Sequence, residues 1–203
     1  RRHQPGLIIA DRTVGGDYED FISPEQQIPD EPLSVPWESC ITLGRSWKYV
    51  STDTAKSTPE VIRMLAETAA KGGNLLLGIG PDSLGRIPTG VVERLTEIGR
   101  WMRANGEAIY GTRPLPPYQS GPVRFTRKAG RAHAIILEPA AAAPGGRISL
   151  RGIRPAEGTS VTLLDNEQPL VWVAEDDGFV VDLPAPAAAA TDAVVLSWPL
   201  HEA

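Results

Sequence analysis

Apolar residues follow two different patterns along this chain, and the change falls near residue 115. In the first half, short apolar runs alternate with stretches in which apolar residues recur every three or four positions, as expected for strands and helices in turn. This alternation predicts an α/β fold. The predicted strands are 6–10, 39–43 and 74–79, and the predicted helices are 59–70 and 90–104.

The segment 74–79 is the most informative part of this half. It follows Gly72 and Gly73, which are suited to end a helix, and precedes a Gly80-Pro81 turn. Its apolar residues are consecutive rather than alternating, so the pattern predicts a parallel strand that helices bury on both faces. Barrels of alternating strands and helices carry their chemistry at the carboxyl ends of such strands.

Both predicted helices have recognisable ends and one apolar side. At the start of the first helix, Ser57 and Glu60 have the spacing of a capping box, and Pro59 suits the first turn. The second helix is predicted to stop at Gly106, and its apolar stripe is predicted to face a sheet. That stripe consists of Val91, Leu95, Ile98 and Met102.

The second half has the pattern of a β-sandwich. After a proline-rich link at 114–122, short strands are separated by turn signals about every 8 to 12 residues. Two stretches rich in Ala and Pro, 140–144 and 184–190, fall between strands and are predicted as loops. The predicted strands, enough for one sandwich, are 123–127, 132–137, 147–151, 160–164, 170–174, 178–183 and 193–198.

The two patterns predict two domains, an α/β domain at 1–115 and an all-β sandwich at 116–203. A complete (β/α)8 barrel needs about 250 residues, so the first domain has the size of half a (β/α)8-like barrel. Half a barrel would leave open sheet edges and an uncovered apolar interior. We therefore expect another segment to complete it.

Composition narrows the function classes. The chain has 203 residues, 41% apolar content and a formal charge of −5. Nucleic acids and anionic membranes are bound through clustered Lys and Arg. An acidic chain lacks such clusters, so we expect neither partner. No run approaches the roughly 18 apolar residues of a membrane span, and the first residues are too short for a signal peptide. Cys40, the single cysteine, is predicted to be a core residue.

Carboxylates are the candidates for catalysis. The sequence has no Ser-His-Asp order, no phosphate-binding glycine loop and no His or Cys cluster at metal spacing, so we expect no cofactor and no metal. The three histidines, His3, His133 and His201, are scattered. His133 and His201 are interpreted as ordinary sandwich residues, and His3 has no partner in view.

Glu25 is the carboxylate of greatest interest. It follows Pro24 in a long polar connection, 15–36, which leaves the end of the first predicted strand and would lie across a barrel mouth. A carboxylic acid near an apolar wall can have its pKa raised enough to protonate a leaving oxygen. The alternative is a solvated loop glutamate, because the connection also holds Asp17, Glu19, Asp20, Asp30 and Glu31.

Three further residues could contact a ligand. Arg12 could direct its guanidinium at a sugar hydroxyl or a carboxylate, or it could form a structural ion pair with Asp11. Trp37 and Trp47 each close an apolar segment and could offer a flat face to a pyranose. Either tryptophan could equally be a core residue.

Several short motifs occur in a fixed order between residues 10 and 110. They are Ala10-Asp11-Arg12, Gly16-Asp17-Tyr18, Ser23-Pro24-Glu25-Gln26, Pro36-Trp37-Glu38, Ser46-Trp47-Lys48-Tyr49, the run 71–81, and Trp101 with Asn105-Gly106-Glu107-Ala108-Ile109-Tyr110. In this order they resemble the α-L-fucosidases of glycoside hydrolase family 29, from the fifth barrel strand through the C-terminal β-sandwich. The resemblance implies that 1–115 is the C-terminal half of the catalytic barrel.

The resemblance also implies roles for individual residues. Glu25 matches the family's general acid/base, Arg12 the arginine near the fucose and the nucleophile, and Trp47 the aromatic wall against the sugar's methyl group. Trp37 and Glu38 match a motif that lines the site or is structural. An insertion before Ser23 leaves Glu19 as an alternative acid/base.

A retaining mechanism follows from the resemblance. In it an aspartate attacks the anomeric carbon and the acid/base first protonates the leaving oxygen and then activates water. In the family that aspartate precedes the Asp-Arg motif, and this sequence begins after it. The implied partners are the missing N-terminal barrel segment of the same enzyme and a fucosylated glycan substrate. Secreted or periplasmic location is common in the family.

Two other functions stay open from the sequence. The sandwich could be a non-catalytic carbohydrate-binding module that binds glycans through Trp172 or Trp198. The chain could also be a structural fragment without a catalytic role.

Overall fold

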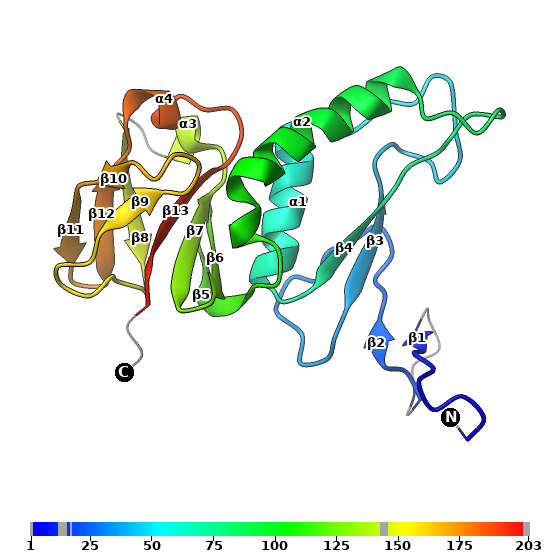
Figure 1. Cartoon of the computed structure of the whole chain (residues 1–203), viewed down its shortest axis with the longest axis horizontal. Coiled ribbons are helices and arrows are strands. Elements are labelled where there is room, and N and C mark those ends of the chain that lie inside the picture. The colour runs from blue at the N-terminus through cyan, green and yellow to red at the C-terminus, as the bar shows by residue number, and fades with distance from the viewer. Residues whose placement is uncertain (1, 12–15, 17, 143–145, 201–203) are drawn as a thin grey trace.

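The computed structural model describes residues 2–11, 16, 18–142 and 146–200. Two helices lie between a small parallel sheet and a larger, sheet-rich part formed by the second half of the chain (Figure 1). The fold is therefore a mixed helix and sheet architecture followed by a sheet-rich part. No helix in these described ranges is long and apolar enough to cross a membrane.

Short parallel strands make up the first sheet region. β1 (Ala10–Asp11) pairs with β2 (Phe21–Ile22), and β3 (Glu38–Thr42) pairs with β4 (Asn74–Gly78). Isolated parallel bridges join Ile22 of β2 to Trp37, just before β3, and Glu25 to Cys40 of β3. The strands predicted at 39–43 and 74–79 are confirmed with a shift of one residue, whereas the first strand occupies only two residues instead of 6–10.

Two helices follow β3 and β4. α1 (Thr58–Ala70) begins with the predicted capping box, in which Ser57 Oγ accepts from the Glu60 amide and a Glu60 carboxylate oxygen accepts from the Ser57 amide, both at 3.3 Å. α2 (Thr89–Asn105) runs into the 3-10 helix η1 (Gly106–Ala108). Its apolar side packs on α1 as well as on the sheet, in a cluster of Leu43, Val61, Leu77, Val91, Ile98 and Met102.

The prediction that the strand at 74–79 is buried on both faces is wrong. Leu77 packs towards the helices, but its neighbour Leu76 points to the other face and is 48% exposed. The helices cover one face of β3 and β4, and the other face is only partly covered, since Cys40 and Thr42 are buried on it but Leu76 is not. An apolar run marks a strand whose faces are both apolar, without showing that both are covered within the same chain.

The second half forms two antiparallel sheets. β5 (Arg113–Ser120), β6 (Val123–Lys128), β7 (Arg131–Ile136), β9 (Val161–Leu163), β10 (Pro169–Leu170) and β13 (Val194–Pro199) form one, in the order β10-β9-β13-β7-β6-β5. β8 (Arg147–Arg151), β11 (Trp172–Glu175) and β12 (Gly178–Asp182) form the other, in the order β11-β12-β8. One apolar core lies between them, with Phe125, Leu150, Phe179, Leu196 and Trp198 among its buried members.

The seven strands predicted in this half are present, with three differences. The predicted strand 170–174 is divided between β10 and β11, which belong to different sheets, with the exposed Val171 between them. The predicted link 114–122 is largely the edge strand β5, where prolines are tolerated because an edge needs fewer amide donors. The short helices α3 (Pro139–Ala142) and α4 (Ala185–Ala188) form in the stretches predicted as loops.

The six-stranded sheet is covered on both faces. One face packs on the three-stranded sheet, and the other packs on α1 and α2. This second cluster joins Ile62 and Trp101 of the helices to Ile135 of β7 and Val195 of β13. The helices and the sandwich therefore share a continuous apolar contact.

An ion pair reinforces this contact. Arg124 of β6 lies 2.5 Å from Glu67 of α1, and Lys71 lies 3.3 Å from the other oxygen of Glu67. Burial raises the pKa of Glu67, but the hydrogen bond and charge of Arg124, together with Lys71, outweigh burial and hold that pKa below its ordinary value. Glu67 is therefore ionised where the two halves meet.

His133 of β7 is fully buried close to η1, which agrees with its interpretation as a sandwich residue. Neither of its ring nitrogens has a hydrogen-bond partner among the residues that the structure describes. Burial, and then the charges of Arg131 and Lys128, lower its pKa from 6.5 to about 4, although the Glu107 carboxylate lies 3.9 Å from Nε2. The imidazole is therefore neutral in the folded protein near pH 7.

Acidification is expected to destabilise the fold through His133. Because the pKa of His133 is lower in the folded than in the unfolded state, its contribution to the free energy of unfolding is fully present above about pH 6.5. That contribution is lost as the pH falls from 6.5 to about 4, by at most about 3 kcal/mol. Urea unfolding at several pH values should show this loss, and His133→Leu should flatten the profile in that window. An unchanged profile in His133→Leu would show that other groups cause the loss.

Candidate active site

Glu25 is fixed on β3 although it lies in a long connection. Cys40 donates its amide to the Pro24 carbonyl and accepts from the Gln26 amide, both at 2.9 Å, so Glu25 and Cys40 form a parallel bridge. The Glu25 side chain is exposed. The sequence places this residue in a loop, and the structure attaches that loop to the sheet as a short strand would be attached.

Trp47 lies over the carboxyl end of β4. Its ring packs on Gly78, where an added Cβ would lie 3.0 Å from ring atom Cζ3, so a larger residue would require the ring to shift. Gly78 is the last residue of β4 and pairs with Thr42, the last residue of β3. Trp47 is 46% exposed and therefore presents ring surface to solvent.

Glu25 and Trp47 lie over the same face of the sheet. Residues that pair across neighbouring strands share a face, and so do residues two apart along a strand. Glu25 pairs with Cys40, and Thr42, two residues further, pairs with the Gly78 that carries the Trp47 ring. This is the face of Leu76, opposite the helices. A carboxyl group beside the middle of β3 and an aromatic surface at the carboxyl end of β4 thus lie over one face of the parallel sheet.

Asp53 holds the loop that carries Trp47. Its carboxylate accepts from the amides of Arg45, Ser46 and Thr54, at distances of 2.8 to 3.2 Å. The Arg45 amide is the main reason that the pKa of Asp53 lies below its ordinary value. Asp53 is not among the residues predicted from the sequence, although an aspartate in a short polar loop is a common acceptor for nearby backbone amides.

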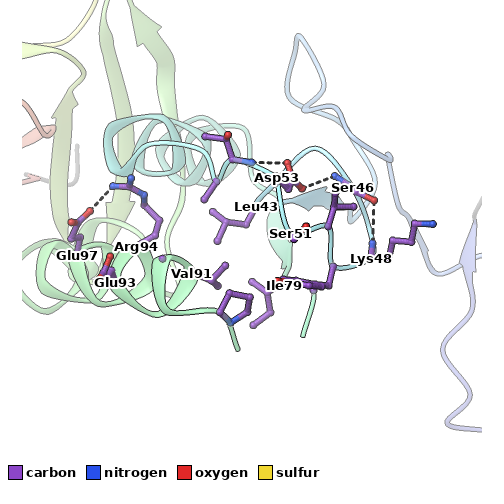
Figure 2. Close-up of a pocket in the computed structure, with 18 residues that line it drawn as sticks. Leu43, Ser46, Lys48, Ser51, Asp53, Ile79, Val91, Glu93, Arg94 and Glu97 are labelled. Atoms are coloured by element: carbon purple, nitrogen blue, oxygen red, sulfur yellow. Dashed lines mark hydrogen bonds and ion pairs between the residues drawn. The ribbon is translucent and has the colours of Figure 1, made fainter. Parts of the chain in front are cut away.

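A pocket of about 420 Å³ lies beside this loop (Figure 2). Its apolar lining includes Leu43, Ile79 and Val91, which belong to the helix-facing side. Its charged lining includes Arg94 and Glu97, which pair with each other at 2.5 Å. The apolar part of the pocket is therefore on the opposite side of the sheet from Glu25.

The remaining predicted site residues are not gathered around Glu25. Trp37 is only 2% exposed and packs against Gly73, as a core residue would. Glu38 is half-buried at the first position of β3, at the opposite end of the strand from Trp47. Arg12 lies outside the described residues. Glu19, the alternative acid/base, accepts from the Gly16 amide at 3.0 Å.

The two tryptophans of the carbohydrate-binding alternative are engaged in the sandwich. Trp198 is 1% exposed and meets Phe179 edge-on with ring centroids 5.5 Å apart, so it has no face to offer a sugar. Trp172 packs on Phe179 from the other side and donates its Nε1 proton to the Thr159 carbonyl at 2.9 Å. The sequence could not show that Trp198 is buried and Trp172 half-buried in the sandwich.

Comparison with known proteins identifies relatives for about three quarters of the chain. The chain is 36% identical over 157 residues to an α-L-fucosidase of Branchiostoma floridae, covering 73% of this chain and 34% of that protein. It is 35% identical over 167 residues to the plasma α-L-fucosidase of Homo sapiens, covering 77% and 35% respectively. The chain therefore spans about a third of the length of these curated relatives.

Solved structures agree with the sequence relatives. Isoenzyme 1 of the Paenibacillus thiaminolyticus α-L-fucosidase superposes with a TM-score of 0.78 at 31% identity, over 90% of this chain and 45% of that one. The Thermotoga maritima α-fucosidase, in complex with a mechanism-based inhibitor, superposes with a TM-score of 0.80 at 26% identity, over 98% of this chain and 46% of that one. The family model described as α-L-fucosidase matches residues 1–107. The chain belongs to the α-L-fucosidase family and corresponds to the C-terminal part of its members.

Proposed function

We propose that this chain is the C-terminal part of an enzyme that removes terminal α-L-fucosyl residues from glycoconjugates with retention of configuration. Glu25 is its general acid/base, and a fucosylated glycan is its substrate. The observation that carries this proposal is the bridge that fixes Glu25 beside Cys40, on the same face as the exposed ring of Trp47, in a chain of the α-L-fucosidase family.

Glu25 acts twice in this mechanism. In the first step an aspartate from outside this chain attacks the anomeric carbon, the glycosidic C–O bond breaks, and the Glu25 proton passes to the leaving oxygen. In the second step the Glu25 carboxylate takes a proton from water, whose oxygen displaces the aspartate from the sugar. Trp47 would pack against the apolar side of the fucose. By the family resemblance, Arg12 would lie near the nucleophile.

The missing partner is the N-terminal barrel segment of the same enzyme. β4 pairs only with β3 among the described strands, and β1 only with β2, so each leaves an edge on which further strands could pair. The exposed Leu76 face would become the interior of the closed barrel. In this arrangement 1–115 is the C-terminal half of a (β/α)8-like barrel, and 116–203 is a sandwich domain.

The test is hydrolysis by the complete enzyme that contains this chain. We expect release of 4-nitrophenol from its α-L-fucoside and little from the α-L-rhamnoside or β-D-galactoside. Proton NMR of the first product should show α-L-fucose, which later mutarotates. Turnover of another glycoside in preference would contradict the substrate, and initial formation of β-L-fucose would contradict the retaining mechanism.

A further inference from the structure

We propose that Gln26 is a positioning residue that holds the acid/base Glu25 and the Trp47 loop in register. This inference rests on the proposed function. The first observation is the backbone of Gln26, which has a φ of 57°. That left-handed conformation is rare for a residue other than Gly, Asn or Asp, and it persists where surrounding contacts impose it.

The Gln26 side chain replaces a backbone group of the sheet. Alternate residues of β3 form backbone hydrogen bonds with the Glu25 segment. The Cys40 amide donates to the Pro24 carbonyl, and the Cys40 carbonyl accepts from the Gln26 amide. The next amide on this side, that of Thr42, would meet the carbonyl of residue 26 in a regular ladder. The backbone turns away at Gln26, and its side-chain Oε1 accepts from the Thr42 amide instead, at 3.3 Å.

The other end of the Gln26 amide extends the contact to the Trp47 loop. Its Nε2 donates to Thr42 Oγ1 at 3.1 Å, and that hydroxyl donates to the Gly44 carbonyl at 2.7 Å. Lys56, where the loop returns, donates to the carbonyls of Thr42 and Gly44 at 2.7 and 3.3 Å. The Gln26 side-chain amide thus links the segment of Glu25 to Thr42. Through Thr42, it is linked to Gly44 and Lys56, which lie at the two ends of the Trp47 loop.

This arrangement requires both a donor and an acceptor on residue 26. A carboxylate would keep the acceptor and lose the donor, and an apolar side chain would lose both. When the link is lost, Glu25 keeps its chemistry but is no longer held at a fixed distance from the sugar bound against Trp47. Misplacement of a catalytic group by about 1 Å can cost about 100-fold in rate.

The experiment compares fucosides with different leaving groups in the complete enzyme. In Gln26→Asn, the asparagine tolerates the backbone conformation but is too short to reach Thr42. Thr42→Val removes the hydroxyl to which Gln26 Nε2 donates. For both, we expect kcat/KM to fall about 10- to 100-fold with phenyl α-L-fucoside, whose leaving oxygen needs a proton. With 2-chloro-4-nitrophenyl α-L-fucoside, which departs without one, the loss should stay below about 3-fold. Thr42→Ser should restore the parent values.

Gln27→Asn is the matched control. Gln27 is exposed on the same segment and contributes its backbone carbonyl, which accepts from Ser39 Oγ. This variant should keep the parent activity on both substrates. Equal losses on both substrates in Gln26→Asn, or an equal loss in Gln27→Asn, would overturn the positioning role.

Hydrogen exchange separates this inference from the proposed function. Gln26→Asn should accelerate exchange of the Thr42 amide about 10-fold or more, whereas Gln27→Asn should leave it unchanged. If the parent enzyme cleaves no fucoside, the proposed function fails while the exchange result still decides whether Gln26 holds the segment. If the parent cleaves fucosides and Thr42 exchange is unchanged in Gln26→Asn, only the role of Gln26 fails.

Discussion

Glu25→Gln in the complete enzyme is expected to lower kcat/KM for an unactivated α-L-fucoside by about 10²- to 10⁴-fold, the usual contribution of a general acid/base. Glutamine keeps the size of the side chain but can neither donate the proton to the leaving oxygen nor take one from water. The loss should be smaller with an activated aryl fucoside, for which the first step needs no acid. Added azide should then accelerate turnover and form a fucosyl azide, because azide needs no base to attack.

Glu19→Gln is the control for this prediction. Glu19 lies in the same connection, is half-buried, and accepts from the nearby Gly16 amide. Its replacement should leave activity within about 3-fold of the parent, a change of well under 1 kcal/mol in transition-state free energy. Loss of activity and azide rescue in Glu19→Gln, with normal turnover in Glu25→Gln, would move the acid/base role from Glu25 to Glu19.

Phe179→Ala is expected to destabilise the complete protein by about 3 to 5 kcal/mol, the range for removing a large aromatic side chain from a core. Phe179 is fully buried on β12 and meets the rings of both Trp172 and Trp198 edge-on, with centroids 5.8 and 5.5 Å away. Removing the ring leaves a cavity between two indoles that cannot close without moving both sheets. Urea unfolding followed by tryptophan fluorescence would measure the loss.

Val173→Ala provides the comparison for Phe179→Ala. Val173 lies on the neighbouring strand β11 and is 56% exposed, so its truncation should change stability by less than about 0.5 kcal/mol. Similar midpoints for the parent and Phe179→Ala would mean that the unfolding transition does not involve the sandwich core.

Elements with local signals could be predicted from the sequence. The capping box at Ser57 and Glu60 fixed the start of α1 to within one residue, because both partners lie within one turn. Strands with alternating or consecutive apolar residues were also located well. β5 was missed because prolines argue against a strand, and only its position at the sheet edge makes them acceptable.

Contacts between distant segments could not be predicted in this way. The sequence marks Glu25 as a loop carboxylate and Trp47 as an aromatic residue after a strand. Their common face follows from the bridge to Cys40 and the packing on Gly78. Trp37 and Trp47 look alike in sequence, yet one is buried and the other is half-exposed. No sequence pattern predicts that the side-chain amide of Gln26 bonds to the backbone amide of Thr42.

The six-stranded sheet serves as a shared wall between the helices and the three-stranded sheet. Ile62 and Trp101 depend on its near face as much as Phe179 depends on its far face. Shortening the chain before β5 would leave Trp101 and much of α1 in water, and would remove Arg124 from the partly buried carboxylate of Glu67. The sandwich is thus needed to support the helices that pack behind Glu25 and Trp47, and we expect that it cannot be deleted without destabilising them.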